Sequence, residues 1–302
     1  MAQFDFQAIG TTWRIDVFQK LDKAEEASLL SRVKDRIDIF DKAYSRFRDD
    51  SLVTEMSQKS GEYTLPPDAD TMMSLYHDLY LKTGGLVTPL IGNLISDAGY
   101  DAKYSLKQRK ELEVPPAWDE ALEYKHSDKG HPPILIVKKP VLLDFGAAGK
   151  GYLIDLVGEV LEANGVTGYC INAGGDILYK NPDKNKGPLR VGLEDPENTE
   201  QVVGICALQG GSICGSAGNR RKWGNFTHII NPKTLTSPTD IIAVWVTAKT
   251  ALVADALATC LFFVPANALT DTYDFEYVLI RKDRSLEKSD GFQGEVYSII
   301  TR

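Results

Sequence analysis

The sequence predicts an α+β protein with largely antiparallel sheet and packed helices, folded as a single domain over residues 1–302. Segments in which apolar and polar residues alternate follow one another in runs, as expected for consecutive strands. Segments with helical periodicity stand between these runs, without the strict strand–helix alternation of a parallel sheet. The 302 residues, 43% of them hydrophobic, can bury a large core, either as one large domain or as two interlocked lobes.

The N-terminal part is expected to open with a strand and then a helix. Trp13, Ile15 and Val17 alternate with polar residues, which predicts a strand, and the apolar residues over 29–44 recur at helical spacing. A second helix is expected to begin at Pro66-Pro67-Asp68 and to end at Thr83-Gly84-Gly85.

The central part is expected to contain a long surface excursion over residues 102–133, which are polar, charged and interrupted by proline. Residues 134–137 and 141–145 are expected to pair as strands, and a glycine-rich turn then leads into a helix over Tyr152–Leu161. Further strands are predicted near residues 169–173, 189–193, 202–208, 226–230, 241–247, 277–280 and 296–300.

Charge and composition restrict the possible partners. The formal net charge of -8 and the pI near 5.2 argue against binding to nucleic acid or to an anionic membrane. No apolar run reaches the roughly 18 residues of a membrane span, and residues 1–12 lack the features of a signal peptide. The four cysteines are far apart and fit buried reduced thiols better than disulfides or a zinc site. These features favour the cytoplasm, or the cell envelope if a signal sequence has been removed.

The segment Leu143–Tyr152 places glycine, alanine and Lys150 at a strand-to-helix turn. Backbone N–H groups, the helix N-terminus and the Lys150 ammonium would together suit an anion. The segment is not a Walker A loop, because Gly151 stands where that loop needs Ser or Thr, and it lacks the Gly-x-Gly-x-x-Gly dinucleotide pattern. A tight structural turn is an equal alternative to an anion site.

Three further segments carry candidate chemistry, and each has a structural alternative. Asn172–Asp176 contains paired glycines that permit a close ligand approach or form a hairpin turn. Asp255 and Thr259 are four residues apart on a predicted helix, so their oxygens could share Mg²⁺, although such an Asp is commonly a helix cap. His228 ends an apolar strand before Asn231-Pro232 and is a candidate general base, although a lone histidine is more often structural.

In their order and separations, these segments resemble the ApbE family of FAD:protein FMN transferases, and the likeness covers most of the chain. Ile9-Gly10-Thr11 is similar to the family's Met-Gly-Thr, Ser45–Ser51 to its Ser-x-Tyr-x-x-Asp-Ser, and Thr83–Pro89 to its Ser-Gly-Gly-x-Phe-Asp-Pro. No single motif is decisive, but the joint order is specific. The segments with the strongest likeness are Asp144–Tyr152 with Asp155, Asn172–Asp176, His228–Pro232 and Ala254–Thr259.

The resemblance implies an ApbE-like, T-fold-like domain with an FAD cleft between two lobes. It implies Mg²⁺-dependent transfer of FMN from FAD to a Thr or Ser hydroxyl of a target flavoprotein, with release of AMP. His228 is implied as the catalytic base, and Mg²⁺ is implied to be held by the Ala147 carbonyl with Asp255 and Thr259. The residues implied to surround FAD are Ile9, Phe47, Leu86, Val87, Thr88, Asp144, Lys150 and Ile242, of which Phe47 could stack on a ring.

The sequence also departs from the family pattern at three positions. Thr88 and Asn231 stand where the family has Asp, and Leu235 stands where it has Gly. Two other functions therefore remain beside the transferase. With water as nucleophile the site would be an FAD pyrophosphatase that yields FMN and AMP, and loss of two carboxylates favours a flavin-binding protein without turnover. The expected partners are FAD and, for the transferase, a protein acceptor.

Overall fold

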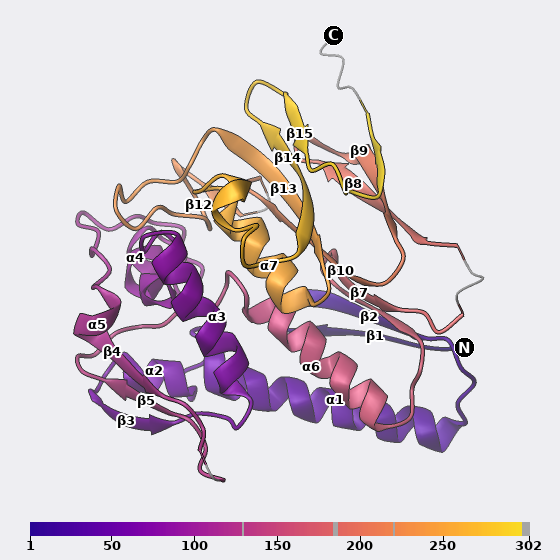
Figure 1. Cartoon of the computed structure of the whole chain (residues 1–302). Coiled ribbons are helices and arrows are strands. Elements are labelled where there is room, and N and C mark those ends of the chain that lie inside the picture. Colours follow the sequence, from indigo (N-terminus) through magenta and orange to yellow (C-terminus); the bar gives the residue numbers. More distant parts are fainter. Residues whose placement is uncertain (129, 184–186, 220, 298–302) are drawn as a thin grey trace. The chain divides into compact units, whose positions relative to one another are not determined.

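The computed structural model describes residues 1–128, 130–183, 187–219 and 221–297 (Figure 1). The chain forms two compact units. The first comprises Met1–Ile37, Lys150–Arg220 and Thr239–Arg302, and the second comprises Asp38–Gly149 and Arg221–Pro238. Among the described residues, all pairings between strands are antiparallel, which confirms the predicted α+β class.

The first unit combines strands with long helices. Its helices are α1 (Lys23–Tyr44), which continues into the second unit, α6 (Gly149–Ala163), α7 (Ala251–Cys260) and the 3-10 helix η2 (Ala266–Ala268). Its strands are β1 (Ala2–Ala8), β2 (Thr11–Val17), β6 (Tyr169–Ala173), β7 (Asp176–Lys180), β8 (Leu189–Asp195), β9 (Asn198–Leu208), β10 (Gly211–Ala217), β13 (Ile241–Ala248), β14 (Phe275–Arg281), β15 (Leu286–Lys288) and β16 (Gly294–Val296).

The main sheet of the first unit has eight strands in the order β1-β2-β6-β7-β10-β13-β14-β15. Successive side chains of a strand point to opposite faces, and both faces of this sheet are covered. On one face Leu178 lies against Gly158 of α6, and Cys214 lies against Ala251 of α7, which packs on β10 and β13 (Figure 1). The strand neighbours Ile177 and Ile213 face the other side.

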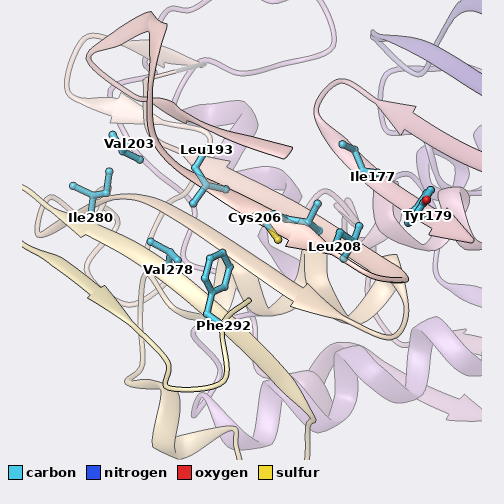
Figure 2. Packing of buried hydrophobic residues seen from close by; sticks show 10 residues of the cluster. Ile177, Tyr179, Leu193, Val203, Cys206, Leu208, Val278, Ile280 and Phe292 are labelled. Carbon is cyan, nitrogen blue, oxygen red and sulfur yellow. The ribbon is translucent and has the colours of Figure 1, made fainter. Parts of the chain in front are cut away.

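The second face of the main sheet packs against a three-stranded sheet of order β16-β9-β8. Figure 2 shows the apolar side chains that meet there, and the cluster is contributed by β7, β8, β9, β10 and β14 and by Phe292. Successive residues of β7 and β14, which point to opposite faces, include buried apolar side chains on both faces. This is the pattern of strands enclosed between two layers. The cluster consists of Ile177, Tyr179, Leu193, Val203, Cys206, Leu208, Ile213, Val278, Ile280 and Phe292.

The second unit contains shorter elements around aromatic side chains. Tyr44, Tyr76 and Phe145 pack together, with ring centroids 5.2 and 5.4 Å from Phe145. A three-stranded sheet has the order β3-β5-β4, and β11 pairs with β12. The elements are α2 (Leu52–Met56), β3 (Gly61–Thr64), α3 (Ala69–Lys82), η1 (Pro89–Ile91), α4 (Gly92–Asp97), α5 (Trp118–Ala121), β4 (Leu122–Lys125), β5 (Ile134–Val137), β11 (Lys222–Trp223) and β12 (Phe226–Thr227).

Two expectations about the central part were wrong. Residues 141–145 form no strand, because both edges of β5 are already paired with β3 and β4. Residues 102–112 do lack regular structure, as an excursion would, but residues 118–125 form α5 and β4. Trp118, Ala121 and Leu122 are buried there, and the charged residues between them masked their pattern in the sequence.

The other expected elements are mostly present, with different ends. The strand expected at 226–230 is only β12, and β16 ends at Val296, so most of the strand expected at 296–300 lies outside the described residues. No disulfide joins the cysteines. Among the residues that the structure describes, no helix has the length and apolar character that a membrane span requires.

Candidate functional site

Two carboxylates and one ammonium meet in the first unit. Lys150, in the first turn of α6, forms an ion pair with Asp176, and its Nζ lies 3.6 Å from Oδ1 of Asp255 on α7. The side chains of Asp176 and Asp255 are only 3% and 6% exposed. Two buried negative charges with one positive charge leave an excess of one negative charge, which favours a further cation at this place.

Backbone hydrogen bonds hold both carboxylates in place. Asp255 Oδ2 accepts the N–H of Gly151 at 2.8 Å, and Asp176 Oδ1 accepts the N–H of Gly215 at 2.9 Å. Each carboxylate therefore has one oxygen engaged by the backbone and its other oxygen directed to Lys150. Thr259 lies one helical turn after Asp255 on α7, so hydroxyl and carboxylate share one side of the helix as expected.

Helix α7 is anchored at its N-terminus by two side chains. Asp155 of α6 accepts the N–H groups of Ala251 and Leu252, each at 2.8 Å, and Thr250 caps the helix by accepting the N–H of Val253 at 3.3 Å. Burial raises the pKa of the Asp155 carboxyl to about 6, although both hydrogen bonds oppose this shift. The N-terminus of α7 is thus capped by Asp155 and Thr250, and Asp255 lies further along the helix, beside Lys150.

The paired glycines form the hairpin turn that was one of the two readings of this segment. Ala173 at the end of β6 pairs with Asp176 at the start of β7, and the intervening Gly174 and Gly175 have φ values of 66° and 102°. Asn172 Oδ1 accepts the N–H of Gly175 at 2.9 Å. The turn contributes to the site through Asp176, a residue that sequence reasoning noted only as the end of the motif.

In the glycine-rich turn before α6, backbone N–H groups donate hydrogen bonds to acceptors within the protein. The N–H of Gly146 bonds Asp144 Oδ1 at 2.7 Å, that of Ala148 bonds the Tyr76 hydroxyl at 3.1 Å, and that of Gly149 bonds the Phe145 carbonyl at 2.7 Å. For these N–H groups, the interpretation as a tight structural turn is therefore correct. Any attraction for an anion comes mainly from the Lys150 side chain.

Phe47, the expected flavin-stacking residue, lies in an aromatic group of the second unit and is 36% exposed. Tyr104 stacks on it with a centroid distance of 5.3 Å and an interplanar angle of 10°, and Tyr100 approaches it edge-on at 5.6 Å. The Arg46 guanidinium carbon lies 4.2 Å from the Phe47 centroid, and this guanidinium forms an ion pair with Asp144. The structure thus brings Phe47 and Asp144 together through Arg46.

The segment Leu86–Thr88 is held by short local hydrogen bonds. Thr83 Oγ1 accepts the N–H of Val87 at 3.0 Å, and Thr88 Oγ1 accepts the N–H of Leu90 at 3.2 Å, which caps η1. Thr88 is buried. An Asp at this position could make the same cap, so the departure from the family leaves the local backbone supported.

His228 follows β12 and is half-buried, and its backbone N–H donates to the Arg221 carbonyl at 3.2 Å. Asn231 Oδ1 accepts the N–H groups of Lys233 and Thr234 at 2.9 and 3.1 Å, so this side chain builds the turn after His228. Leu235 has φ 58°, a left-handed conformation that glycine adopts without strain, where the family has Gly.

Two of the expected FAD contacts lie at strand ends of the first unit. Ile9 occupies the β1–β2 turn with φ 43°, beside Gly10 with φ 74°. Ile242 lies at the register irregularity of β13 and packs on the apolar cluster of Figure 2.

Sequence reasoning missed two residues of these groups. Arg46 precedes Phe47, and Asp176 ends the segment Asn172–Asp176. Their burial and ion pairing identify them as candidate site residues, and both properties depend on segments that are distant in the sequence. Ala147 is half-buried in the turn between Asp144 and α6.

The architecture is that of flavin transferases of known structure. An ApbE protein from Thermotoga maritima superposes with a TM-score of 0.79 at 19% identity, covering 96% of this chain and 97% of its own. The flavin transferase ApbE from Vibrio cholerae gives 0.75 at 21% identity, covering 95% and 96%. These identities establish a common fold.

The chain belongs to the ApbE family, whose sequence model matches residues 9–277. Proteins named FAD:protein FMN transferase from Klebsiella pneumoniae and Salmonella typhimurium are 24% and 25% identical to it, over 83% and 82% of this chain and 75% and 74% of their own lengths. The predictions of family membership and of an enzyme are confirmed.

Proposed function

We propose that this protein transfers FMN from FAD to a Thr or Ser hydroxyl of a partner protein and releases AMP. The hydroxyl oxygen attacks the phosphorus of the FMN half of the pyrophosphate. The bond from that phosphorus to the bridging oxygen breaks, and AMP leaves. The observation that carries the proposal is the buried group of Lys150, Asp176 and Asp255, whose excess negative charge suits a divalent cation beside a phosphate-binding lysine.

Asp255, Thr259 and the Ala147 carbonyl are the proposed Mg²⁺ ligands. They offer a carboxylate, a hydroxyl and a carbonyl, the hard oxygen donors that Mg²⁺ prefers. The proximity of Asp255 Oδ1 to the Lys150 ammonium supports a cation-binding role for this oxygen. Mg²⁺, when bound, supplies positive charge that offsets the charge of the pyrophosphate. The chain's own contribution is to hold the Asp255 carboxylate through the Gly151 N–H and to keep Lys150 beside it.

FAD is proposed to contact Ile9, Phe47, Leu86, Val87, Thr88, Asp144, Lys150 and Ile242, with residues 1–302 acting as one transferase domain. His228 is the proposed base that takes the proton of the attacking hydroxyl. At two positions where the family has a carboxylate, this chain has a side chain with a structural role. Thr88 caps η1 and Asn231 builds a turn, so both side chains are engaged in roles that Thr and Asn fulfil.

The decisive experiment incubates the protein with FAD, Mg²⁺ and a flavoprotein acceptor that carries a Thr or Ser flavinylation site. Flavin fluorescence on the acceptor in a denaturing gel, with an equal amount of AMP, is the expected result. AMP without a labelled acceptor would identify a pyrophosphatase, and FAD binding without AMP would identify a binding protein.

Asp255→Ala should abolish Mg²⁺-dependent AMP release while the protein stays folded, because a charged metal ligand is lost. Asp271→Ala is the matched control, since Asp271 is an exposed carboxylate outside the site. Mg²⁺-dependent turnover that persists in Asp255→Ala would remove this residue from the metal site.

A further inference from the structure

Arg46 is a buried guanidinium with unused hydrogen-bond donors. It follows α1 in the second unit, and its side chain is 3% exposed. Its Nε donates to Oδ2 of Asp144. Its two terminal nitrogens, Nη1 and Nη2, are buried and have no hydrogen-bond partner among the residues that the structure describes. Buried donors of a charged group are costly to leave without acceptors, and such groups call for an explanation.

The surroundings of Arg46 stabilise its positive charge but, in the described part of the chain, provide no acceptors for its terminal N–H groups. The guanidinium carbon lies 4.2 Å from the Phe47 ring centroid and 5.0 Å from that of Tyr100. Cation–π attraction and the Asp144 carboxylate together stabilise a buried positive charge. Ring faces are weak acceptors, however, and they do not replace the oxygen lone pairs that the terminal N–H groups require.

Asp144 does not accept from these two nitrogens in the structure, because its carboxylate is hydrogen-bonded to Arg46 through Nε and leaves Nη1 and Nη2 without a partner among the described residues. Oδ1 accepts the Gly146 N–H at 2.7 Å, and Oδ2 accepts Arg46 Nε. We infer that the Nη1 and Nη2 groups of Arg46 bind the carbonyl oxygens of the flavin ring of FAD. This assignment rests on the proposed function and adds Arg46 to the proposed FAD contacts. It also makes Arg46 the group that donates to the ligand, while Asp144 holds Arg46 and the turn.

Charge balance favours a ring carbonyl over a phosphate as the acceptor. Arg46 and Asp144 already form a neutral pair, so a carbonyl would complete the hydrogen bonds without adding charge. A phosphate would add negative charge to this buried pair, and the Arg221 guanidinium, 5.7 Å from the Tyr100 centroid, is exposed and therefore offsets that charge only weakly. The neighbouring rings point to the same choice. Tyr104 stacks on Phe47, and Trp223 stacks on Tyr100 at 5.6 Å, an environment that suits a planar aromatic ligand.

The test compares ligands that contain the ring with one that lacks it. Arg46→Lys keeps a positive charge for Asp144 but loses the planar pair of terminal donors. Its dissociation constants for FAD and FMN should rise about 10- to 100-fold, the range for hydrogen bonds to a charged group, while that for ADP stays unchanged. Arg48→Lys is the matched control. Arg48 is in the same loop but bonds Asp41 and Asp50, so its variant should bind all three ligands as the wild type does.

Each other outcome overturns the inference. Unchanged FAD affinity in Arg46→Lys would show that the terminal nitrogens do not bind FAD, and weakened ADP binding would assign them to a phosphate. If Arg46→Lys does not fold, the double variant Arg46→Met/Asp144→Asn, which replaces the ion pair by neutral groups, is compared with Asp144→Asn alone, and the double variant must lose further FMN affinity without loss of ADP affinity. Failure of the proposed function is seen separately, as wild-type protein that binds FAD without releasing AMP.

Discussion

At the scale of residues, two carboxylates of the first unit, Asp176 and Asp255, are buried beside Lys150, and the half-buried Asp155 is compensated in a different way. Asp155 accepts two backbone N–H bonds, whereas Asp176 and Asp255 accept one each and lie beside Lys150. Burial of a carboxylate is unfavourable unless hydrogen bonds or opposite charge offset it. The first arrangement anchors a helix, and the second leaves excess negative charge for a cation.

Asp155 should make stability depend on pH. Its pKa is raised from 3.8 to about 6 by burial, so the folded state binds a proton more tightly than the unfolded state. The stability from this group is fully present below pH 4 and is lost as pH rises through 6, by about 2–3 kcal/mol at 1.36 kcal/mol per pKa unit. In urea denaturation, the unfolding free energy of the wild type should fall by this amount between pH 4 and pH 7, relative to that of Asp155→Asn. A difference that does not change with pH would contradict the shift.

His228→Ala should slow AMP release and flavin transfer by about 10²–10⁴-fold, the usual contribution of a positioned general base. FAD affinity should stay nearly unchanged, because the base acts on the incoming hydroxyl. Initial rates and FAD titrations of the same preparation measure both quantities. His77→Ala is a suitable comparison, since that residue lies on α3 beside Trp118. A collapse of FAD binding in His228→Ala would place His228 in the FAD pocket instead.

At the scale of elements, the close approach of α6 and α7 positions Asp255. A Cβ at Gly151 would lie 2.1 Å from the Ala251 carbonyl oxygen and 2.7 Å from Cβ of Asp255. Only glycine allows this separation, and the same approach lets the Gly151 N–H reach the Asp255 carboxylate. The proposed metal site therefore depends on the helix contact as well as on the identity of its ligands.

Gly151→Ala should force the two helices apart, with a loss of about 1–3 kcal/mol in unfolding free energy from overpacking. The Mg²⁺ concentration needed for half-maximal AMP release should rise, because Asp255 moves with α7. Gly187→Ala is the control, as a Cβ there meets nothing within 4 Å. Wild-type stability and Mg²⁺ dependence in Gly151→Ala would show that the contact relaxes without consequence.

At the scale of the whole molecule, the eight-stranded sheet of the first unit is covered on both faces and carries candidate site residues at its periphery. Asp176 starts β7 after the paired glycines, and Ile9 lies in the β1–β2 turn. The core of Figure 2 lies on one face, and α7 packs on the other, so the strands have little freedom to shift. Loops and helix starts attached to such a sheet can hold polar groups in fixed positions.

FAD should stabilise the whole chain more than FMN does, because FMN lacks the pyrophosphate proposed for Lys150. A ligand at about 100 times its dissociation constant adds about 2.7 kcal/mol to the unfolding free energy. In thermal unfolding with Mg²⁺, FAD should therefore raise the midpoint more than equal concentrations of FMN or ADP. Equal shifts with FAD and FMN would count against a pyrophosphate contact.

The sequence by itself determined the α+β class, the family and much of the local structure. Strand β2 and helix α1 carry clear apolar periodicity, because the spacing of buried side chains follows directly from backbone geometry. The shared side of α7 for Asp255 and Thr259 followed from the same geometry. The roles of these residues stay predictions, as do those of His228 and the FAD contacts.

Only the tertiary structure decided which distant residues meet. It paired β5 with β3 and β4 instead of residues 141–145, joined Lys150 to Asp176, and buried Arg46 beside Asp144. Residues Arg46 and Asp144 are 98 positions apart, and no local pattern encodes such a contact. Periodicity records which face of an element is buried, whereas the partner of a charged side chain depends on the packing of the complete chain.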